Sequence, residues 1–422
     1  MQLTKKKRIK GALASATCAL LGGADVLAAD NENGWEISTA LLYYSEKDRV
    51  TAAEPSIFAK KTYADESKLN LNFVVDALTG ASPNGAAPSD QVQTFTRPSG
   101  NGSFDVASGE IPLDDTFHDT RVQAGVGWEA PISRVTRYNV GANISTEYDY
   151  RSLSVSGGLA HDFNKKNTTV ALGLAFAADE ITPEGGIPTP YASMAAAGDE
   201  QPRQGSSESK DVVDIMLGVT QVINAQMLMQ FNLGMSQSSG YLNDPFKIIS
   251  IVDVEGRPMD YIYENRPDSR SKNYFYWSTQ YHLPIDDTID FSYRFMTDDW
   301  GIASHTLDFR YRWNLSQHWY VQPHFRLYQQ TGADFYRHSL SAAEAVPEDV
   351  TADYRLADMD ALTVGLKVGY ALGENSEINV RLETYQQTGE NRPDDAIGVQ
   401  KQFDMFPELD ATIFQLTYSF KY

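Results

Sequence analysis

Histidines and paired acidic residues are the side chains with the clearest capacity to bind a metal ion. The chain has seven His, but none are spaced as His-x-x-x-His or His-x-x-Glu-His, and the only cysteine is Cys18. The acidic pairs at 114–115, 298–299 and 394–395 could bind calcium through hard oxygen atoms, although such pairs are more often only solvated. We therefore predict no cofactor and no metal site, and leave a loop-bound calcium ion open.

Two dipeptides could supply part of a hydrolase. Ser304-His305 and His118-Asp119 fall at expected strand ends, and a Ser–His–Asp device requires hydrogen bonds between its members. Adjacent residues of a strand point to opposite faces, so Ser304 and His305 would not activate one another there. We predict that the protein is not an enzyme, and keep an integral-membrane hydrolase as a third alternative.

Charged side chains recur at alternate positions of the segments between 287 and 388. If these positions face the inside of a barrel, they form a basic wall, whereas the matching positions of 119–238 are mostly Gly, Ala and Ser. Arg and Lys along a pore favour anions, but the same cations could simply neutralise inward carboxylates, and both interpretations are left open. The predicted basic wall consists of Arg294, Arg310, Arg312, Arg326, Lys367 and Arg381, and the predicted lumen carboxylates are Asp290, Asp308 and Glu383.

Alternation of apolar and polar residues identifies the elements that carry these side chains. Near the C-terminus, Phe414, Leu416, Tyr418 and Phe420 alternate with polar residues, which is the period of a β-strand. Segments of about ten to thirteen residues with this pattern suit strands that cross a bilayer at a tilt. Sixteen are predicted, with fourteen or eighteen left open: 35–46, 50–63, 67–78, 119–130, 137–149, 151–163, 167–177, 211–223, 226–238, 271–283, 287–298, 303–314, 317–330, 359–371, 376–388 and 410–422.

The connections between these segments differ in length on the two sides. Short joins follow the even-numbered segments, and every long join follows an odd-numbered one, at about 79–118, 179–210, 239–270, 331–358 and 389–409. Lipid cannot satisfy the N–H and C=O groups of an open sheet edge, so the sheet must close. We predict an all-β fold, a transmembrane antiparallel β-barrel of about 16 strands with short periplasmic turns and long extracellular loops.

Composition agrees with this fold and excludes two other classes of protein. The chain has 422 residues, a net charge of −21 and 11% aromatic residues, and its mean hydropathy is −0.39. No apolar run approaches the roughly 20 residues that a membrane helix needs, which excludes a helical membrane protein. The acidic balance argues against nucleic acid as a partner. Low mean hydropathy is expected of a barrel in which half of each strand faces a polar lumen.

The N-terminal segment has the pattern of a secretory signal peptide. A basic head with four Lys and one Arg between 5 and 10 precedes an apolar stretch from Gly11 to Leu21, and small residues follow at Ala28 and Ala29. We predict a signal peptide at 1–29, cleaved after Ala28 or Ala29, and a single barrel domain at 30–422. Cleavage would remove Cys18 and leave a mature chain without cysteine.

Several strings together resemble an uncharacterised family of Gram-negative outer-membrane β-barrels, domain of unknown function family 3570. The resemblance spans about residues 33–422 and implies an outer-membrane location and a barrel, with no established activity. Members of this family are encoded near flavin-transferase and thioredoxin-like genes, which implies a redox context. The strings include Asp76-Ala-Leu-Thr-Gly-Ala-Ser-Pro-Asn-Gly-Ala86, Gly240-Tyr-Leu-Asn-Asp-Pro-Phe-Lys247, Tyr263-Glu-Asn-Arg-Pro-Asp-Ser-Arg270 and Ala333-Asp-Phe-Tyr-Arg337.

Tyr422 is similar to the aromatic ending that outer-membrane assembly machinery reads, so that machinery and outer-membrane lipid are the expected partners. The first functional hypothesis is a pore or transporter for an unidentified small solute, with a basic-lined lumen. The alternative is a loop-closed, non-conducting barrel that serves as scaffold or partner of a periplasmic or surface redox system. The long loops would either form a ligand site or fold onto one another and cap the barrel.

Overall fold

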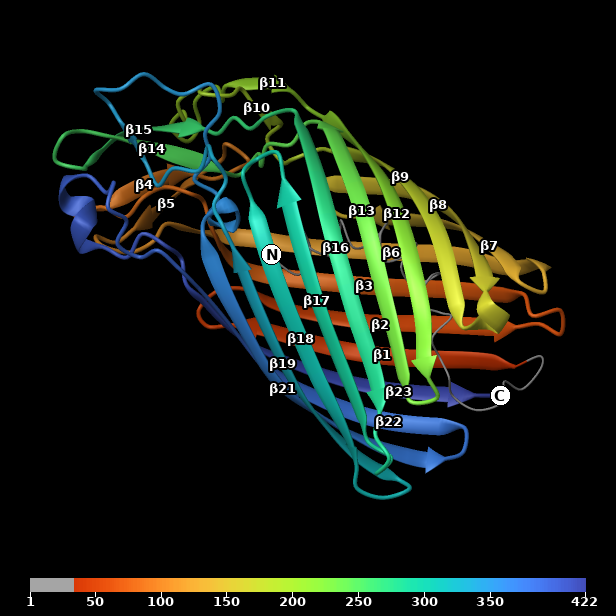
Figure 1. Cartoon of the computed structure of the whole chain (residues 1–422). Coiled ribbons are helices and arrows are strands. Elements are labelled where there is room, and N and C mark those ends of the chain that lie inside the picture. The colour runs from red at the N-terminus through yellow and green to blue at the C-terminus, as the bar shows by residue number, and fades with distance from the viewer. Residues whose placement is uncertain (1–33) are drawn as a thin grey trace.

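The computed structural model describes residues 34–422, apart from the side chains of 115–117. The predicted signal peptide lies outside the described residues. Sixteen antiparallel strands form one closed barrel, as the sequence predicted (Figure 1). They are β1 (Trp35–Glu46), β2 (Thr51–Thr62), β3 (Lys68–Pro83), β6 (Leu113–Ser133), β7 (Thr136–Thr146), β8 (Tyr150–Phe163), β9 (Thr168–Ile181), β12 (Glu208–Asn224), β13 (Met227–Gly240), β16 (Ser269–His282), β17 (Thr288–Asp298), β18 (Ala303–Asn314), β19 (Trp319–Gln330), β21 (Met359–Gly373), β22 (Ser376–Gly389) and β23 (Leu409–Lys421).

The first and last strands close the barrel. β1 pairs with β23 along its length, from Glu36 opposite Lys421 to Glu46 opposite Ala411. At the end of this ladder, the N–H of Trp35 donates to the carbonyl of Tyr422 at 2.8 Å, and the N–H of Tyr422 donates to Trp35 at 3.0 Å. The sheet therefore has no open edge, which is the condition that a lipid environment imposes.

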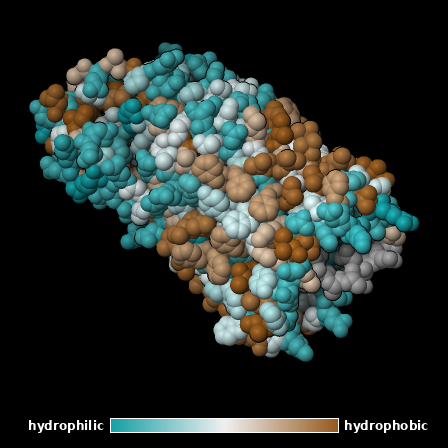
Figure 2. All heavy atoms as spheres, viewed as in Figure 1, coloured by the Kyte–Doolittle hydropathy of each residue, from teal (hydrophilic) through white to brown (hydrophobic). Residues whose placement is uncertain are grey.

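Side chains alternate between an apolar outer face and an inner face of small or polar residues. On β9, Leu172 and Leu174 are 48% and 53% exposed, whereas Ala171 and Ala175, which flank them at alternate positions, are buried. Figure 2 shows apolar residues spread over the barrel wall and mostly hydrophilic residues over the long loops. An apolar outer band of this kind suits contact with lipid hydrocarbon. Among residues 34–422, no helix is long and apolar enough to cross a membrane.

Several strands extend beyond their predicted ends, and two of them do so by five residues or more. The sequence placed the third strand at 67–78 and the fourth at 119–130, but β3 continues to Pro83 and β6 begins at Leu113, and the two remain paired up to these residues. Their register shifts after Gly80, whose φ is +145° and where a Cβ would lie 2.3 Å from the carbonyl oxygen of Arg49. Glycine thus permits the register shift beyond which the paired strands β3 and β6 continue past the barrel wall.

All long connections lie at one end of the barrel, and the connections at the other end are all short turns (Figure 1). These loops do fold onto one another, and we call the five of them, 84–112, 182–207, 241–268, 331–358 and 390–408, the cap. The cap contains a three-stranded sheet, β15-β14-β20, which joins loop 241–268 to loop 331–358, and two hairpins, β4-β5 and β10-β11, each within one loop. The short elements are β4 (Gln93–Thr96), β5 (Ser103–Val106), β10 (Ile187–Pro188), β11 (Arg203–Gly205), β14 (Ile248–Val252), β15 (Pro258–Tyr263), β20 (Leu340–Ser341), and the 3-10 helices η1 (Asn164–Lys166, at a short turn), η2 (Tyr354–Leu356) and η3 (Gly398–Gln402).

Candidate functional site

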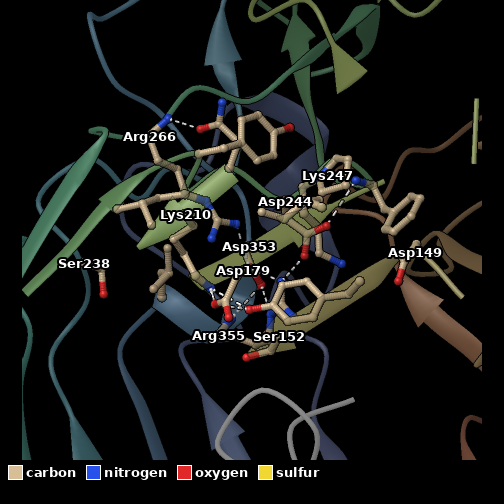
Figure 3. Close-up of a pocket in the computed structure, with 18 of the residues that line it drawn as sticks. Asp149, Ser152, Asp179, Lys210, Ser238, Asp244, Lys247, Arg266, Asp353 and Arg355 are labelled. Atoms are coloured by element: carbon tan, nitrogen blue, oxygen red, sulfur yellow. Dashed lines mark hydrogen bonds and ion pairs between the residues drawn. The ribbon is translucent and has the colours of Figure 1, made fainter. Parts of the chain in front are cut away.

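A cavity of about 650 Å³ lies at the loop end, lined both by the inner face of the barrel and by the cap. Figure 3 shows Lys210 and Asp179 from the barrel among Arg266, Asp353 and Arg355 from the cap. The volume falls in the range of small-molecule sites. The cavity is thus a site to which strands and loops distant in sequence both contribute.

Two arginines organise the cap side of the cavity. Nε of Arg266 lies 2.7 Å from Oε1 of Glu264, and its Nη2 lies 2.8 Å from Oδ2 of Asp353. Nε of Arg355 donates to Oδ1 of Asp353 at 2.6 Å, while its Nη2 contacts both Asp353 and Asp244. The backbone N–H of Asp244 donates to Oε1 of Glu264 at 2.5 Å. This cap ion network joins the loop 241–268 to the loop 331–358.

Burial and charge oppose one another within the cap ion network. Burial disfavours the carboxylate of Asp353, but Arg355 and Arg266 outweigh it and hold the pKa of Asp353 below its ordinary value. For Glu264, burial outweighs the attraction of Arg266 and raises the pKa. Burial and the neighbouring Arg355 both lower the pKa of Lys247. The network is therefore held by close pairing rather than by solvation.

Most cations on the barrel side of the cavity are also paired. Nζ of Lys210 lies 2.9 Å from Oδ2 of Asp179, and Nη2 of Arg121 lies 3.2 Å from Oδ2 of Asp76. Each cation therefore has a carboxylate on a neighbouring strand, so neither carries an uncompensated charge.

Arg270 is paired in the same way and also borders an apolar surface. Its Nη2 lies 2.5 Å from Oδ2 of Asp298, and its guanidinium carbon is 4.3 Å from the ring centroid of Trp300. Trp300 belongs to an apolar cluster whose other members on the cavity wall are Leu242, Met296, Ile302 and Leu356. The cavity consequently has one apolar side beside its charged residues.

Lys272 and Asp214 are the exceptions to this pairing. They are 9% and 4% exposed and both line the cavity. In the part of the chain that the structure describes, Lys272 has no hydrogen bond and no carboxylate within 4.0 Å, and Oδ1 of Asp214 has no hydrogen-bond partner. A buried charge without a partner is costly, so these two side chains point to an interaction that the protein alone does not provide.

The predicted basic wall lies on β17 to β22, between the cavity and the short turns. Asp308 is its centre: Arg310 approaches it at 3.2 Å, Arg326 at 3.9 Å, and Nε2 of His324 at 3.2 Å. His324 stands at an alternate position two residues before Arg326, but sequence reasoning did not include it among the site residues. The structure brings these residues together as an ion-pair group; whether they select anions stays a prediction.

The remaining members of the wall form smaller groups. Nε of Arg381 lies 3.8 Å from Oε1 of Glu383, and Asp290 accepts a hydrogen bond from Gln280 at 3.1 Å. The ring of Tyr320 makes cation–π contacts with two of the cations, since Arg312 lies 3.6 Å and Lys367 5.3 Å from its ring centroid. Arg294 stands apart, 5.2 Å above the ring of Tyr274.

Sequence reasoning missed the cavity. Its barrel-side charges lie at alternate positions near the loop ends of the strands, as Lys210 and Asp214 do on β12. Charge at an alternate position was the available signal. Its significance depends on which strands are neighbours and on how the loops return over them, and neither can be read from one segment.

The other sequence candidates are dispersed. Ser304 is buried whereas His305 is exposed on the opposite face, with its Nδ1 2.8 Å from the hydroxyl of Tyr293. Within residues 34–422, no group of three or more His, Cys, Asp or Glu is placed to bind a metal ion. The carboxylate of Asp298, one of the proposed calcium ligands, is engaged by Arg270. Calcium binding stays a prediction.

Comparison with known proteins gives one family match. The model described as "Protein of unknown function (DUF3570)" matches residues 10–420. No curated protein matches the sequence. Structures that resemble the barrel include the siderophore receptor PirA from Acinetobacter baumannii, at 6% identity and a TM-score of 0.42, which covers 86% of this chain and 54% of that chain. The chain thus spans about half the length of that receptor.

Two other similar structures are matched over nearly their whole length. The outer membrane protein OpdK from Pseudomonas aeruginosa has 9% identity and a TM-score of 0.41, with 93% of this chain and 99% of that chain covered. A bacterial polysaccharide outer membrane secretin has 8% identity and a TM-score of 0.43, with 94% and 100% covered.

Proposed function

Because this chain belongs to the DUF3570 family, whose function is unknown, we propose from the geometry that it is an outer-membrane channel for small solutes. Solutes enter through the cavity at the loop end and then pass the basic wall. The apolar outer face and the closed sheet support insertion in a membrane. The long loops face the cell exterior, and the C-terminal strand that ends beside Tyr422 is the segment for the assembly machinery.

The observation that carries this proposal is the position of the cavity. About 650 Å³ of space opens inside the mouth of the barrel, between charged strand ends and the cap. Sixteen strands enclose enough cross-section for an aqueous channel. Nothing in this arrangement requires catalysis, and we propose a transport role without enzymatic activity, cofactor or resident metal ion.

Conductance measurements test the channel. Purified protein that migrates differently before and after boiling, and so is a folded barrel, would be added to planar lipid bilayers. We expect stable single-channel steps, and we expect the protein to fractionate with the outer membrane. Silence across several lipid compositions with demonstrably folded protein would contradict the channel, and recovery in the soluble periplasm would contradict the location.

A second candidate function is supported by the packing of the cap. The cap ion network and the sheet β15-β14-β20 fasten two long loops together over the mouth, as a non-conducting scaffold or partner of a redox system would require. This alternative predicts a silent wild-type protein. It also predicts that Arg355→Met, which weakens the network, produces conductance that the wild type lacks.

A further inference from the structure

We infer that the cavity at the loop end binds a small zwitterionic solute, one that carries both a carboxylate and an ammonium group on an apolar body. Lys272 binds the carboxylate of this solute and Asp214 binds its ammonium group. This inference rests on the proposed function, because it names the solute class that enters the channel.

Lys272 supplies the cationic half of the site. It interacts electrostatically with Asp298 and Arg270, but the carboxylate of Asp298 is already engaged by Arg270 at 2.5 Å and by the backbone N–H groups of Trp300 and Ile302 at 3.1 and 2.9 Å. The ammonium group of Lys272 therefore faces the cavity with hydrogen-bond capacity unused. A carboxylate from a bound solute would satisfy it.

Asp214 supplies the anionic half. Ser236 offers a hydroxyl to its carboxylate, yet Oδ1 remains without a hydrogen-bond partner in the described structure. Lys210, which lies on the same strand, is held by Asp179 at 2.9 Å, and the cation that acts on Asp214 electrostatically is Lys272. Asp214 thus keeps acceptor capacity that an ammonium group could use.

The strand register sets the spacing between these two charges. Asp214 pairs with Ser236 of β13, and Ser236 pairs with Lys272 of β16. One strand therefore separates the two residues, which puts their Cα atoms about 10 Å apart. They do not form an ion pair within 4.0 Å of one another, so a solute with both charges can insert between them.

The balance of charge excludes a simple anion or cation as the better ligand. Lys210, Arg121 and Arg270 are each matched by a carboxylate. Among the described buried charged side chains on the barrel strands of the cavity, Lys272 and Asp214 are thus the two without an ion pair within 4.0 Å, although they attract each other at longer range. A solute with a single charge would satisfy one of the two buried groups and leave the other desolvated, which costs affinity.

The apolar side of the cavity specifies the rest of the solute. Met296 pairs with Tyr274, two residues along the same face from Lys272, and it packs in the cluster with Trp300 and Leu356. This surface lies beside the charged pair and would take an aromatic or aliphatic group. A free amino acid with a large apolar side chain has all three features.

Calorimetric titration with three probes of similar size tests the site. L-phenylalanine carries both charges, phenylacetate carries only the carboxylate, and phenethylamine carries only the ammonium group. We expect L-phenylalanine to bind to the detergent-solubilised, full-length mature barrel, and each single-charge probe to bind at least tenfold more weakly. No binding of L-phenylalanine up to its solubility, or equal binding of phenylacetate, would overturn the inference.

Variants assign the two charges. Lys272→Met should abolish the preference for L-phenylalanine over phenethylamine, and Asp214→Asn should abolish the preference over phenylacetate. Lys60→Met, which alters an ion pair with Glu36 at the opposite end of the barrel, should bind L-phenylalanine as the wild type does. Should either cavity variant fail to fold on the boiling test, Lys272→Gln or Asp214→Ser replaces it. Unchanged preferences in a folded variant would contradict the assignment.

The same preparations separate this inference from the channel proposal. Conductance without binding of L-phenylalanine would refute the zwitterion site and leave the channel standing. Binding without conductance would refute the channel and leave the site. If the protein both conducts and binds L-phenylalanine, the amino acid should reduce the single-channel current of the wild type and have no effect on that of Lys272→Met.

Discussion

Nδ1 of His324 lies 2.8 Å from Oε1 of Glu383, although β21 runs between the strands that carry them. Gly365 is the residue of β21 that pairs with both. A Cβ at this glycine would lie 2.5 Å from Cγ of Glu383, so the absence of a side chain is what allows the two to meet. The contact links three strands in the middle of the basic wall.

Replacing Gly365 should therefore break this link. In Gly365→Ala, the added methyl group displaces Glu383 from His324, and overpacking together with a lost buried hydrogen bond should lower the free energy of unfolding by about 1–3 kcal/mol. Urea titration, with the folded fraction read from gel mobility, measures this free energy of unfolding. Gly373→Ala is the matched control, since a Cβ there meets nothing within 4 Å, and equal losses in both variants would contradict the explanation.

The basic wall should set the ion preference of the channel. Arg310 and Arg326 both approach Asp308, so replacing both with Ala removes two cations and leaves His324 as its partner. The reversal potential in a salt gradient should shift toward cation preference, and the single-channel conductance should increase because two long side chains are lost. A stable double variant with an unchanged reversal potential would show that these arginines do not line the conducting path.

The cap should open when its ion network is broken. Arg355→Met removes the cation that joins Asp353 to Asp244 and leaves Asp353 with Arg266, which should destabilise the local packing by about 3–5 kcal/mol. Limited proteolysis should then cut the loops at 241–268 and 331–358 faster than in the wild type. Arg257→Met is the control, because its pair with Asp90 is exposed and screened by salt. An unchanged digestion pattern in Arg355→Met would mean that the network does not hold the cap.

Acid should loosen the cap through His338. Burial lowers the pKa of this imidazole below its ordinary value of 6.5, and the nearby Asp395 only partly offsets the effect. The packed cap thus binds the proton less readily than an opened cap does. The stabilisation is complete above about pH 6.5 and is lost as the pH falls below that value, until the lowered pKa is reached.

Hydrogen exchange of the loop 331–358 at pH 7.5 and pH 5.5 measures this effect. Its amides should exchange faster at the lower pH, after correction for the intrinsic rate. His338→Gln cannot take up the proton and should show a smaller difference between the two values. If the variant keeps the full wild-type difference, another group is responsible.

The barrel could be predicted from the sequence. The predicted segment 303–314 is the strand β18 from Ala303 to Asn314, and the predicted long joins all form the cap. This information is local, because a strand that crosses lipid must repeat apolar residues at every second position over a fixed length, and closure follows from the unpaired edges. The family resemblance, now matched over residues 10–420, added no activity.

The place where the unpaired charges meet could be found only in the folded structure. Asp214 and Lys272 lie on strands separated by β13, and the register of two ladders places both at the same cavity. Likewise, the pairing of Arg266 with Asp353 depends on how two loops fold back over the mouth. Alternation assigns each side chain to a face of the sheet, but it does not determine which residues of other strands and loops lie beside it. Those partners are fixed by strand register and loop packing over long sequence separations.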